Sequence, residues 1–501
     1  MLFTRLAKSA IMTLAISLVL SGCAVGPDFK TPEAPSAGSS NSYTPTALPD
    51  QTAEADGNAG VAQRFTFGQD IPGQWWSLFH SEALDQMIRN ALLQSPNMSS
   101  AQATLRQAQE NYNAQSGSLL YPNVNGQLSE GRQRASAVST GLPGGSVFNL
   151  TNASVNVSYT LDVFGASRRA LEGSQAAVDY QRFQVEATYL TLTTNLVTTA
   201  VKEASLRGQL QATREVLENQ QKQLAVIEKQ FTLGAIPRTT VLTQRNQVAQ
   251  TLASVPALEK ALAQTRHQLS VYAGKLPSES GMPEFQLDSL QLPQDLPVTL
   301  PSALVRQRPD IRASEELLHE ASAQIGVATA NQYPQITLSG SYGSATTQIA
   351  DLFGRGAGFW SLAAGLMQPI FNGGELSAKR RAAIAAYDQA EAQYRITVLL
   401  AFQNVADTLR AIDSDASTLK AQVEVEALAQ EALNLITDQY RLGAVSYLAL
   451  LDAQRSYQQA HIGRVQAQAA RYADTAALFQ ALGGGWWNRQ PLADAVPTAA
   501  N

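Results

Sequence analysis

The sequence predicts a mainly α-helical protein with a transmembrane β-barrel that several copies of the chain build together. Three observations predict this fold class: a lipoprotein-type leader, alternating segments long enough to cross a bilayer, and two very long helices with an apolar heptad repeat. The 501 residues include one Cys and four His, and 15% are charged, which excludes a disulfide framework and a Cys-rich metal site. A mean hydropathy of -0.13 excludes a polytopic helical membrane protein, and a net charge of -5 gives no electrostatic footprint for nucleic acid.

Residues 1–22 have the form of a bacterial lipoprotein signal peptide. A basic stretch precedes the apolar run Ala10–Leu20, which is too short to span a bilayer. The run ends in the motif LSGC, which supplies Cys23. We expect cleavage before Cys23 and a diacylglyceryl and N-acyl lipid on it, with no other cofactor, because several acyl chains give stable anchoring. Ala24 at the second mature position favours the cell outer membrane, and an ordinary signal peptide followed by a buried free cysteine is the alternative.

The mature chain is predicted to be two copies of one structural unit. Residues 96–122 resemble 309–334, and QFTLGA at 230–235 resembles QYRLGA at 439–444, so the copies lie about 210 positions apart. Each copy reads as a helix, two strands, a long helix, a turn and a return helix. The expected parts are a lipidated tether and girdle segment at 23–80, a first repeat at 81–297, a second repeat at 298–482 and a C-terminal tail at 483–501.

Four segments alternate between apolar and polar residues, as amphipathic strands do. The alternation is strict at 154–163 and 335–342 and weaker in the other two segments. About ten residues with one apolar and one polar face suit a tilted strand that crosses a bilayer. A half-buried sheet of a soluble protein is the alternative, but the outer-membrane address favours a barrel. The expected strands are 122–138, 148–163, 334–348 and 358–370, with hairpin tips at 139–146 and 349–357.

The number of strands predicts an oligomer. Four strands cannot close a barrel, and an open edge in hydrocarbon leaves backbone groups without hydrogen bonds. Two chains would supply eight strands, whose barrel is filled by side chains, whereas three would supply twelve strands around a lumen. A homotrimer is therefore the smallest ring that could conduct anything large.

Two segments, 166–233 and 375–442, are predicted to be single helices because they are almost free of Gly and Pro. At about 1.5 Å per residue each is roughly 100 Å long, and a seven-residue apolar spacing, as at Leu210, Leu217 and Leu224, indicates paired and supercoiled helices. With strands at one end of such a rod and the LGA turns at the other, the assembly would be a conduit across the periplasm. The other expected helices are 97–120, 237–272, 310–332 and 445–482.

Five short motifs, taken in order, resemble the TolC-type outer-membrane efflux factors, specifically the OprM/NodT lipoprotein branch. They are CAVGPDF at 23–29, RPDI at 308–311, PIFNGG at 369–374, YRLG at 440–443 and YLALLDAQR at 447–455. The resemblance covers residues 23–487. It implies a homotrimer with a twelve-stranded barrel, a twelve-helix periplasmic tunnel and a mixed α/β girdle. It also implies docking to a periplasmic membrane-fusion adaptor and to an inner-membrane pump of the resistance-nodulation-division class, with no catalysis by the chain.

The predicted function is therefore the outer-membrane exit channel of a tripartite efflux pump, whose substrate the pump would choose. The nearest alternative is the outer-membrane duct of a type I protein secretion system, which would share the fold. A structural coiled-coil lipoprotein would not need four alternating strands. An enzyme is disfavoured because no phosphate loop or nucleophile motif occurs and the four histidines are scattered, and metal binding is disfavoured because Met and His do not cluster.

Candidate gate residues lie where the second return helix begins. A three-fold axis would bring three copies of one side chain together, so a carboxylate ring could select cations and an apolar ring could seal the pore. Leu448 and Asp452, four apart on one helical face, suit these roles, and Tyr440 and Arg441 are further tip contacts. The alternative for Asp452 is a solvated charge. Some relatives have an Asp and an Arg where this chain has Ala449 and Val445, which puts a salt-bridged lock in doubt.

The two LGA turns are the candidate docking surface for the adaptor. Gly suits the place where a helix ends and the chain reverses. The glycines could serve the turn alone, and the sequence does not separate the two roles. The docking residues are Leu233, Gly234 and Ala235 in the first turn and Leu442, Gly443 and Ala444 in the second.

Overall fold

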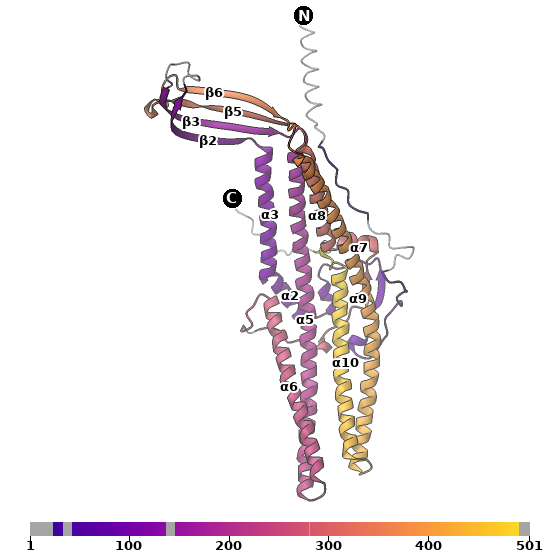
Figure 1. Ribbon diagram of the computed structural model, residues 1–501. Coiled ribbons are helices and arrows are strands. Elements are labelled where there is room, and N and C mark those ends of the chain that lie inside the picture. The colour runs from indigo at the N-terminus through magenta and orange to yellow at the C-terminus, as the bar shows by residue number, and fades with distance from the viewer. Residues whose placement is uncertain (1–23, 34–42, 137–145, 280, 490–501) are drawn as a thin grey trace. The chain divides into compact units, whose positions relative to one another are not determined.

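The computed structural model describes residues 24–33, 43–136, 146–279 and 281–489, which fall into two compact units (Figure 1). Each unit takes segments from both predicted repeats, so the units do not follow the expected division at 297/298. Cys23, most of the hairpin tip expected at 139–146, and the tail from 490 lie outside the described residues. Unit 1 is Met1–Pro32, Thr104–Arg182 and Ala313–Arg395, and unit 2 is Glu33–Ala103, Phe183–Arg312 and Ile396–Asn501.

Unit 1 contains one antiparallel sheet of four strands in the order β2-β3-β5-β6 (Figure 1). The end of each strand lies within three residues of the position expected from the alternation. Strand β6 stops before the expected residue 370, where Pro369 has no N–H to give to a ladder. The strands are β2 (Asn123–Ala135), β3 (Ser146–Leu161), β5 (Gln335–Thr346) and β6 (Gly358–Met367).

The register of this sheet separates apolar from polar side chains. Directly opposed residues share a face. One face carries the opposed pairs Val124–Val157, Val155–Tyr342, Tyr159–Leu338, Tyr342–Trp360 and Gly340–Leu362. The other face carries Asn125–Asn156, Gln127–Ser154, Ser158–Ser339, Thr160–Thr337 and Ser341–Ser361. The predicted amphipathic strands are confirmed, and their pairing makes one continuous face of each kind.

Six long helices carry most of the chain (Figure 1). Two of them, α5 and α9, have 67 residues each, and short turns join them to the return helices α6 and α10. Among the described residues no helix is apolar enough over a sufficient length to cross a membrane. The helices are α3 (Pro96–Leu120), α5 (Ala166–Thr232), α6 (Arg238–Tyr272), α8 (Pro309–Ala330), α9 (Glu375–Arg441) and α10 (Tyr447–Ala481).

Unit 2 also contains two short strands and two short helices that the periodicity of the sequence did not predict individually. Strands β1 (Arg64–Phe67) and β4 (Asp295–Val298) pair in parallel, and α2 (Glu82–Gln94) and α7 (Pro301–Gln307) lie in the same unit (Figure 1). Buried aromatic side chains hold this part of the unit together. The ring of Trp75, in a 3-10 turn, stacks on that of Phe479 in α10 at 5.2 Å between centroids.

Candidate functional site

The two helical hairpins of unit 2, α5–α6 and α9–α10, end in turns of the same geometry. In the first, the N–H of Ala235 donates to the carbonyl oxygen of Gln230 at 2.9 Å, and Gly234 has φ 75°. In the second, Ala444 donates to Gln439 at 2.8 Å, and Gly443 has φ 74°. A left-handed glycine with a six-to-one hydrogen bond is the Schellman ending of a helix. The conformation therefore explains both glycines, because nothing lies within 4 Å of a Cβ placed at either position.

Each turn presents an exposed leucine directly before its glycine. Leu233 is 77% exposed and Leu442 is 84% exposed. A large apolar side chain that stands in water at a helix tip is a candidate anchor for a partner. The structure thus places all six candidate docking residues in two similar surface turns, while their role in docking stays a prediction.

The candidate gate residues lie at the tip of the α9–α10 hairpin. Leu448 occupies the first turn of α10 and is 58% exposed, and Asp452 follows one turn later with its Oδ1 3.6 Å from Nη1 of Arg455. At the end of α9, Arg441 lies 3.3 Å from Asp438. Both ion pairs are exposed, so each is worth little by itself. The gate role of Leu448 and Asp452 depends on other copies of the chain and stays a prediction.

The sequence did not identify Tyr447 as a contact between the two hairpins. Its hydroxyl donates a hydrogen bond to Oε1 of Gln244 in α6, and its ring lies 5.6 Å from that of Tyr440. Burial and the neighbouring Tyr440 raise the pKa of Tyr447, so its hydroxyl keeps its proton near neutral pH. Tyr447 begins the YLALLDAQR motif, so the motif could have marked it as a candidate contact. Gln244 is a single polar residue in a helix and stands in no motif, so the sequence could not have identified it as the partner.

Two more side-chain pairs join the hairpins further along the same helices. Nε2 of Gln454 donates to Oε1 of Gln223 at 2.8 Å, and Nε of Arg455 donates to Oε1 of Gln247 at 3.1 Å. With Tyr447 these bonds form a ladder between α10 and the α5–α6 hairpin. Uncharged partners dominate the ladder, so we expect it to be weakly dependent on salt.

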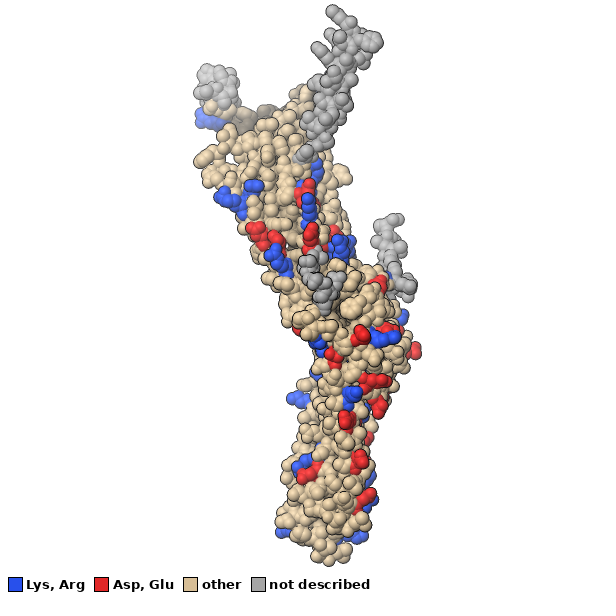
Figure 2. Space-filling view, turned by 90° about the vertical axis from the view of Figure 1, so that its right-hand side faces the viewer, with Lys and Arg blue, Asp and Glu red and all other residues tan. Residues whose placement is uncertain are grey.

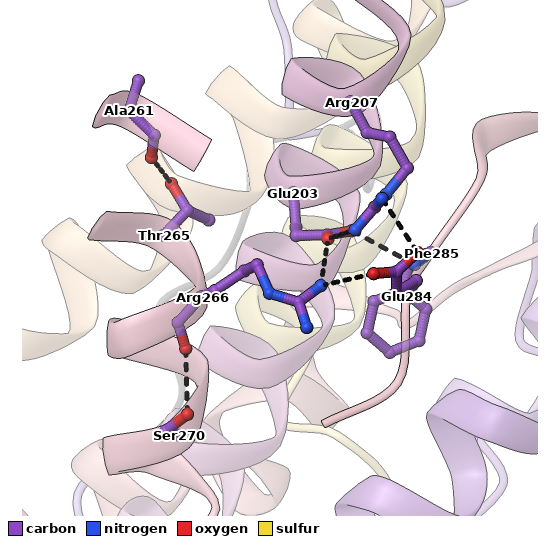
Figure 3. Close-up of polar contacts among 8 residues, drawn as sticks. All are labelled: Glu203, Arg207, Ala261, Thr265, Arg266, Ser270, Glu284 and Phe285. Atoms are coloured by element: carbon purple, nitrogen blue, oxygen red, sulfur yellow. Dashed lines mark hydrogen bonds and ion pairs between the residues drawn. The ribbon is translucent and has the colours of Figure 1, made fainter. Parts of the chain in front are cut away.

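A buried ion cluster fixes the α5–α6 hairpin farther from its tip (Figure 3). Glu203 in α5 is fully buried and accepts hydrogen bonds from Arg207 at 2.5 Å and from Arg266 in α6 at 3.1 Å. The N–H of Phe285 donates to its second oxygen at 3.1 Å, and Arg207 also lies 2.9 Å from Glu284. The buried charge is thus compensated from three segments of the chain, as a buried carboxylate requires.

The α9–α10 hairpin has a different polar cluster, in which two carboxylates face each other. Burial, followed by hydrogen bonding to Asp474 and by its charge, raises the pKa of Asp415 in α9 to about 7. Fully buried Arg471 in α10 donates instead to the carbonyl oxygens of Ala59 and Val61, both at 2.7 Å. Burial lowers the pKa of Arg471 to about 10, so it stays charged at neutral pH. This hairpin therefore contains a group that titrates near neutrality.

Residues 25–29, shortly after Cys23, contact other segments of unit 1. The N–H of Val25 donates to the carbonyl oxygen of Phe164 at 3.1 Å, three residues after the end of β3. Asp28 pairs with Arg169 of α5 at 2.5 Å, and the ring of Phe29 stacks on His319 of α8 at 4.3 Å. The expected tether has no regular secondary structure here, but these contacts hold it close to the end of a strand.

The apolar face of the unit 1 sheet is exposed. Its most exposed large side chains are Leu128, Tyr342, Trp360, Leu362 and Leu366, each more than 65% accessible. A contiguous apolar face of this size on a chain marks contact with a partner or a membrane. Along β5 the face runs from Ile336 to Tyr342, roughly 20 Å at about 3.3 Å per residue.

Acidic and basic residues can be compared on one face of the molecule. Figure 2 shows acidic and basic residues intermingled along the face that it presents. Within the described part of the chain, no three side chains of His, Cys, Asp or Glu are grouped so that they could hold a metal ion.

Comparisons with known proteins agree with this arrangement. The model of the outer membrane efflux protein family matches residues 87–275 and 300–484. The pyoverdine export outer membrane protein OpmQ of Pseudomonas aeruginosa is 32% identical over 431 residues, which covers 84% of this chain and 89% of that protein. The probable outer membrane lipoprotein SilC of Salmonella typhimurium is 27% identical over 483 residues, covering 96% of this chain and 99% of SilC.

A solved structure extends the likeness to three dimensions. The outer-membrane channel OprN matches with a TM-score of 0.81 and 26% identity, over 93% of this chain and 100% of that one. The predicted fold class, long helices with a small sheet of strands, is confirmed. The matched proteins are channels and export proteins, and the family is one of efflux proteins, which favours efflux over the type I secretion alternative.

Proposed function

Because this chain belongs to the outer membrane efflux protein family and is an efflux channel of the cell outer membrane, we propose that three copies form the exit duct of a tripartite pump. One observation carries the trimer: a four-stranded sheet that has one apolar face, one polar face and two unpaired edge strands, β2 and β6. Such edges cannot remain open in hydrocarbon.

The strand directions allow closure between copies. Neighbouring strands in the order β2-β3-β5-β6 are antiparallel, so β2 and β6 run in opposite directions. The β6 edge of one copy can therefore pair with the β2 edge of the next in the same antiparallel pattern. Three copies give twelve strands, whose Asn, Gln, Ser and Thr side chains line an aqueous lumen while the apolar face meets lipid.

The lipid anchor is assigned from the lipoprotein motif at Cys23, and the partners are assigned from the exposed leucines of the two hairpin turns. Cys23 carries the diacylglyceryl and N-acyl lipid, and two of the residues that follow it, Val25 and Asp28, contact the segment between the end of β3 and the first turn of α5. The exposed Leu233 and Leu442 dock with a periplasmic adaptor, which connects the duct to an inner-membrane pump of the resistance-nodulation-division class. The chain itself catalyses nothing, and the pump selects the small molecules that leave.

The gate of the duct lies at the hairpin tips. Leu448 seals by apolar contact around the three-fold axis, and Asp452 gives a ring of carboxylates that favours cations. Tyr440 and Arg441 line the same tip. The hydrogen bond of Tyr447 to Gln244 holds the α9–α10 hairpin against its neighbour.

Loss of the chain tests the proposed function in the cell. Deletion of its gene should increase the intracellular accumulation of a fluorescent pump substrate, and the wild-type chain should restore efflux. Leu362→Pro, in the middle of β6, should not restore it, because Pro cannot donate to a β ladder and disrupts the strand whose edge closes the duct. Unchanged accumulation of every small molecule tested, together with loss of a secreted protein, would support a secretion duct instead.

A further inference from the structure

We propose that the apolar face of the sheet carries a binding site for a phosphorylated glycolipid of the outer leaflet. One acyl chain lies in a groove beside Phe353, and a phosphate lies against Arg132 and Arg355. The inference rests on the proposed function because it requires the apolar face of the sheet to contact lipid. It goes further because it assigns a lipid class to a defined place on the protein.

The groove is formed where the β5–β6 connection folds over the sheet. The hydroxyl of Ser344, which lies on the apolar face, donates to the carbonyl oxygen of Leu352 and holds the connection there. Leu352 is buried beneath the connection, whereas the next residue, Phe353, is 93% exposed. The space that remains is about 580 Å³, within the range of small-molecule sites.

The walls of this groove are mainly apolar. Leu128, Val155 and Tyr342 supply the part from three neighbouring strands, and Leu352 and Phe353 supply the part from the connection. Gly126, at one end, has nothing within 4 Å of a Cβ placed on it, so the groove is open there. An open apolar groove on a lipid-facing surface fits an acyl chain, which buries its surface there without needing polar partners.

Basic side chains follow directly beyond the apolar face. Leu128 is the last apolar residue on this face of β2, and Glu130, Arg132 and Arg134 continue it at two-residue steps. Arg132 stands about 13 Å beyond Leu128 along the strand. From the other side, exposed Arg355 comes directly after Gly354, which lines the groove.

The net charge of the strand ends and of the β5–β6 connection favours binding of a phosphate group. The described strand ends and connection here contribute Arg132, Arg134 and Arg355 against Glu130 and Asp351, so positive charge prevails. Arginine binds phosphate through paired, charge-assisted hydrogen bonds.

An aromatic pair marks the membrane boundary at the same place. Tyr342 and Trp360 oppose each other where the apolar face ends, and aromatic residues of membrane barrels sit at the level of the headgroups. The groove begins at this level and extends toward the hairpin tips, because Leu128 and Ser344 lie two residues beyond Gly126 and Tyr342, and the arginines follow in the same direction. A molecule that has acyl chains joined to a phosphorylated sugar matches both parts at once.

The test uses the purified full-length trimer, stripped of lipid in detergent. Lipopolysaccharide, phosphatidylglycerol and an uncharged glycolipid are titrated separately, and binding is followed by native mass spectrometry. The wild-type trimer should bind lipopolysaccharide at least tenfold more tightly than either other lipid. Arg132→Gln with Arg355→Gln should lose at least about a hundredfold of that affinity, as expected for the loss of two hydrogen bonds to a charged group. Gly126→Phe, which fills the groove, should also weaken binding.

The control is Arg381→Gln, in an exposed position on α9, which should leave lipopolysaccharide binding unchanged. Equal binding of the three lipids by the wild type, or full affinity in both site variants, would overturn the inference. Tight binding of phosphatidylglycerol at the same arginines would also overturn it, because a simple anionic surface would then suffice. Conductance in planar bilayers separates the two proposals: a trimer that conducts normally but lacks this lipid preference leaves the exit-duct proposal standing.

Discussion

The hydroxyl of Tyr447, in the first turn of α10, donates a hydrogen bond to the side-chain oxygen of Gln244 in α6. The bond joins two hairpins that are otherwise connected near their tips by Gln454–Gln223 and Arg455–Gln247. Because the candidate gate residue Leu448 is the next residue along the chain, a movement of Tyr447 away from Gln244 would move Leu448 as well.

Removal of this one hydroxyl should favour the open duct. A net hydrogen bond contributes about 1 kcal/mol, so Tyr447→Phe should raise the open-to-closed ratio about fivefold while the ring keeps its packing. Single-channel recording in planar bilayers measures the ratio directly. Tyr457→Phe, whose ring stacks on His461 in the same helix, is the control and should behave as the wild type. An unchanged open probability in Tyr447→Phe would show that this bond does not hold the gate.

Changes at the two candidate gate residues should separate sealing from selectivity. Leu448→Ala removes the exposed apolar side chain and should raise single-channel conductance, because the constriction becomes wider. Asp452→Asn keeps the size but removes the charge, so it should reduce the preference for K⁺ over Cl⁻ measured from reversal potentials in a salt gradient. Asp438→Asn, at the end of α9, is a matched control for loss of an exposed carboxylate. If neither Leu448→Ala nor Asp452→Asn alters the recordings, the pore constriction lies elsewhere.

The buried Glu203 should be far more sensitive to substitution than exposed ion pairs of the same helices. Glu203→Ala leaves Arg207 and Arg266 without their shared buried partner, so the folded state should lose about 3–5 kcal/mol. Glu259→Ala breaks the exposed pair with Arg214 and should cost less than about 1 kcal/mol. Thermal unfolding of the detergent-solubilised protein, followed by circular dichroism, compares the two variants. Equal melting temperatures would mean that the cluster is not a structural anchor.

Stability should depend on pH through Asp415. Its carboxyl has a pKa of about 7 in the folded protein, whereas an unfolded Asp has a pKa of about 4. Between these values the folded chain binds more protons than the unfolded chain, so this contribution is complete at low pH and is lost as the pH rises through 7. Asp415→Asn should therefore raise the melting temperature more at pH 8 than at pH 5.

Asp413→Asn, two residues away on α9, serves as the control for this pH effect. Its melting temperature relative to the wild type should change little between pH 5 and pH 8. A gain for Asp415→Asn that is the same at both pH values would contradict the assigned titration.

The strands and long helices could be predicted because each has a local signal. Strict alternation specifies both faces of β3 and β5 residue by residue, and the near absence of Gly and Pro accounts for the uninterrupted α5 and α9. The turns were predictable for a similar reason, since Gly234 and Gly443 supply the left-handed conformation that ends each helix.

The parts that escaped prediction depend on contacts between distant segments. Strands β1 and β4 have four residues each, too few for a period, and they pair only because the chain brings Arg64 beside Asp295. The bond between Tyr447 and Gln244 likewise joins residues 203 positions apart. Periodicity within a helix predicts which face is apolar, but it does not predict which uncharged polar side chain on another hairpin it will meet.

The mass of the intact lipoprotein, extracted in mild detergent and measured by native mass spectrometry, tests most directly whether the pore wall is shared between chains. We expect particles of three processed, lipidated chains, because three is the smallest number of copies that closes the free edges of β2 and β6 around an open lumen. Stable particles that contain one chain, and that make bilayers leaky in that form, would contradict the account.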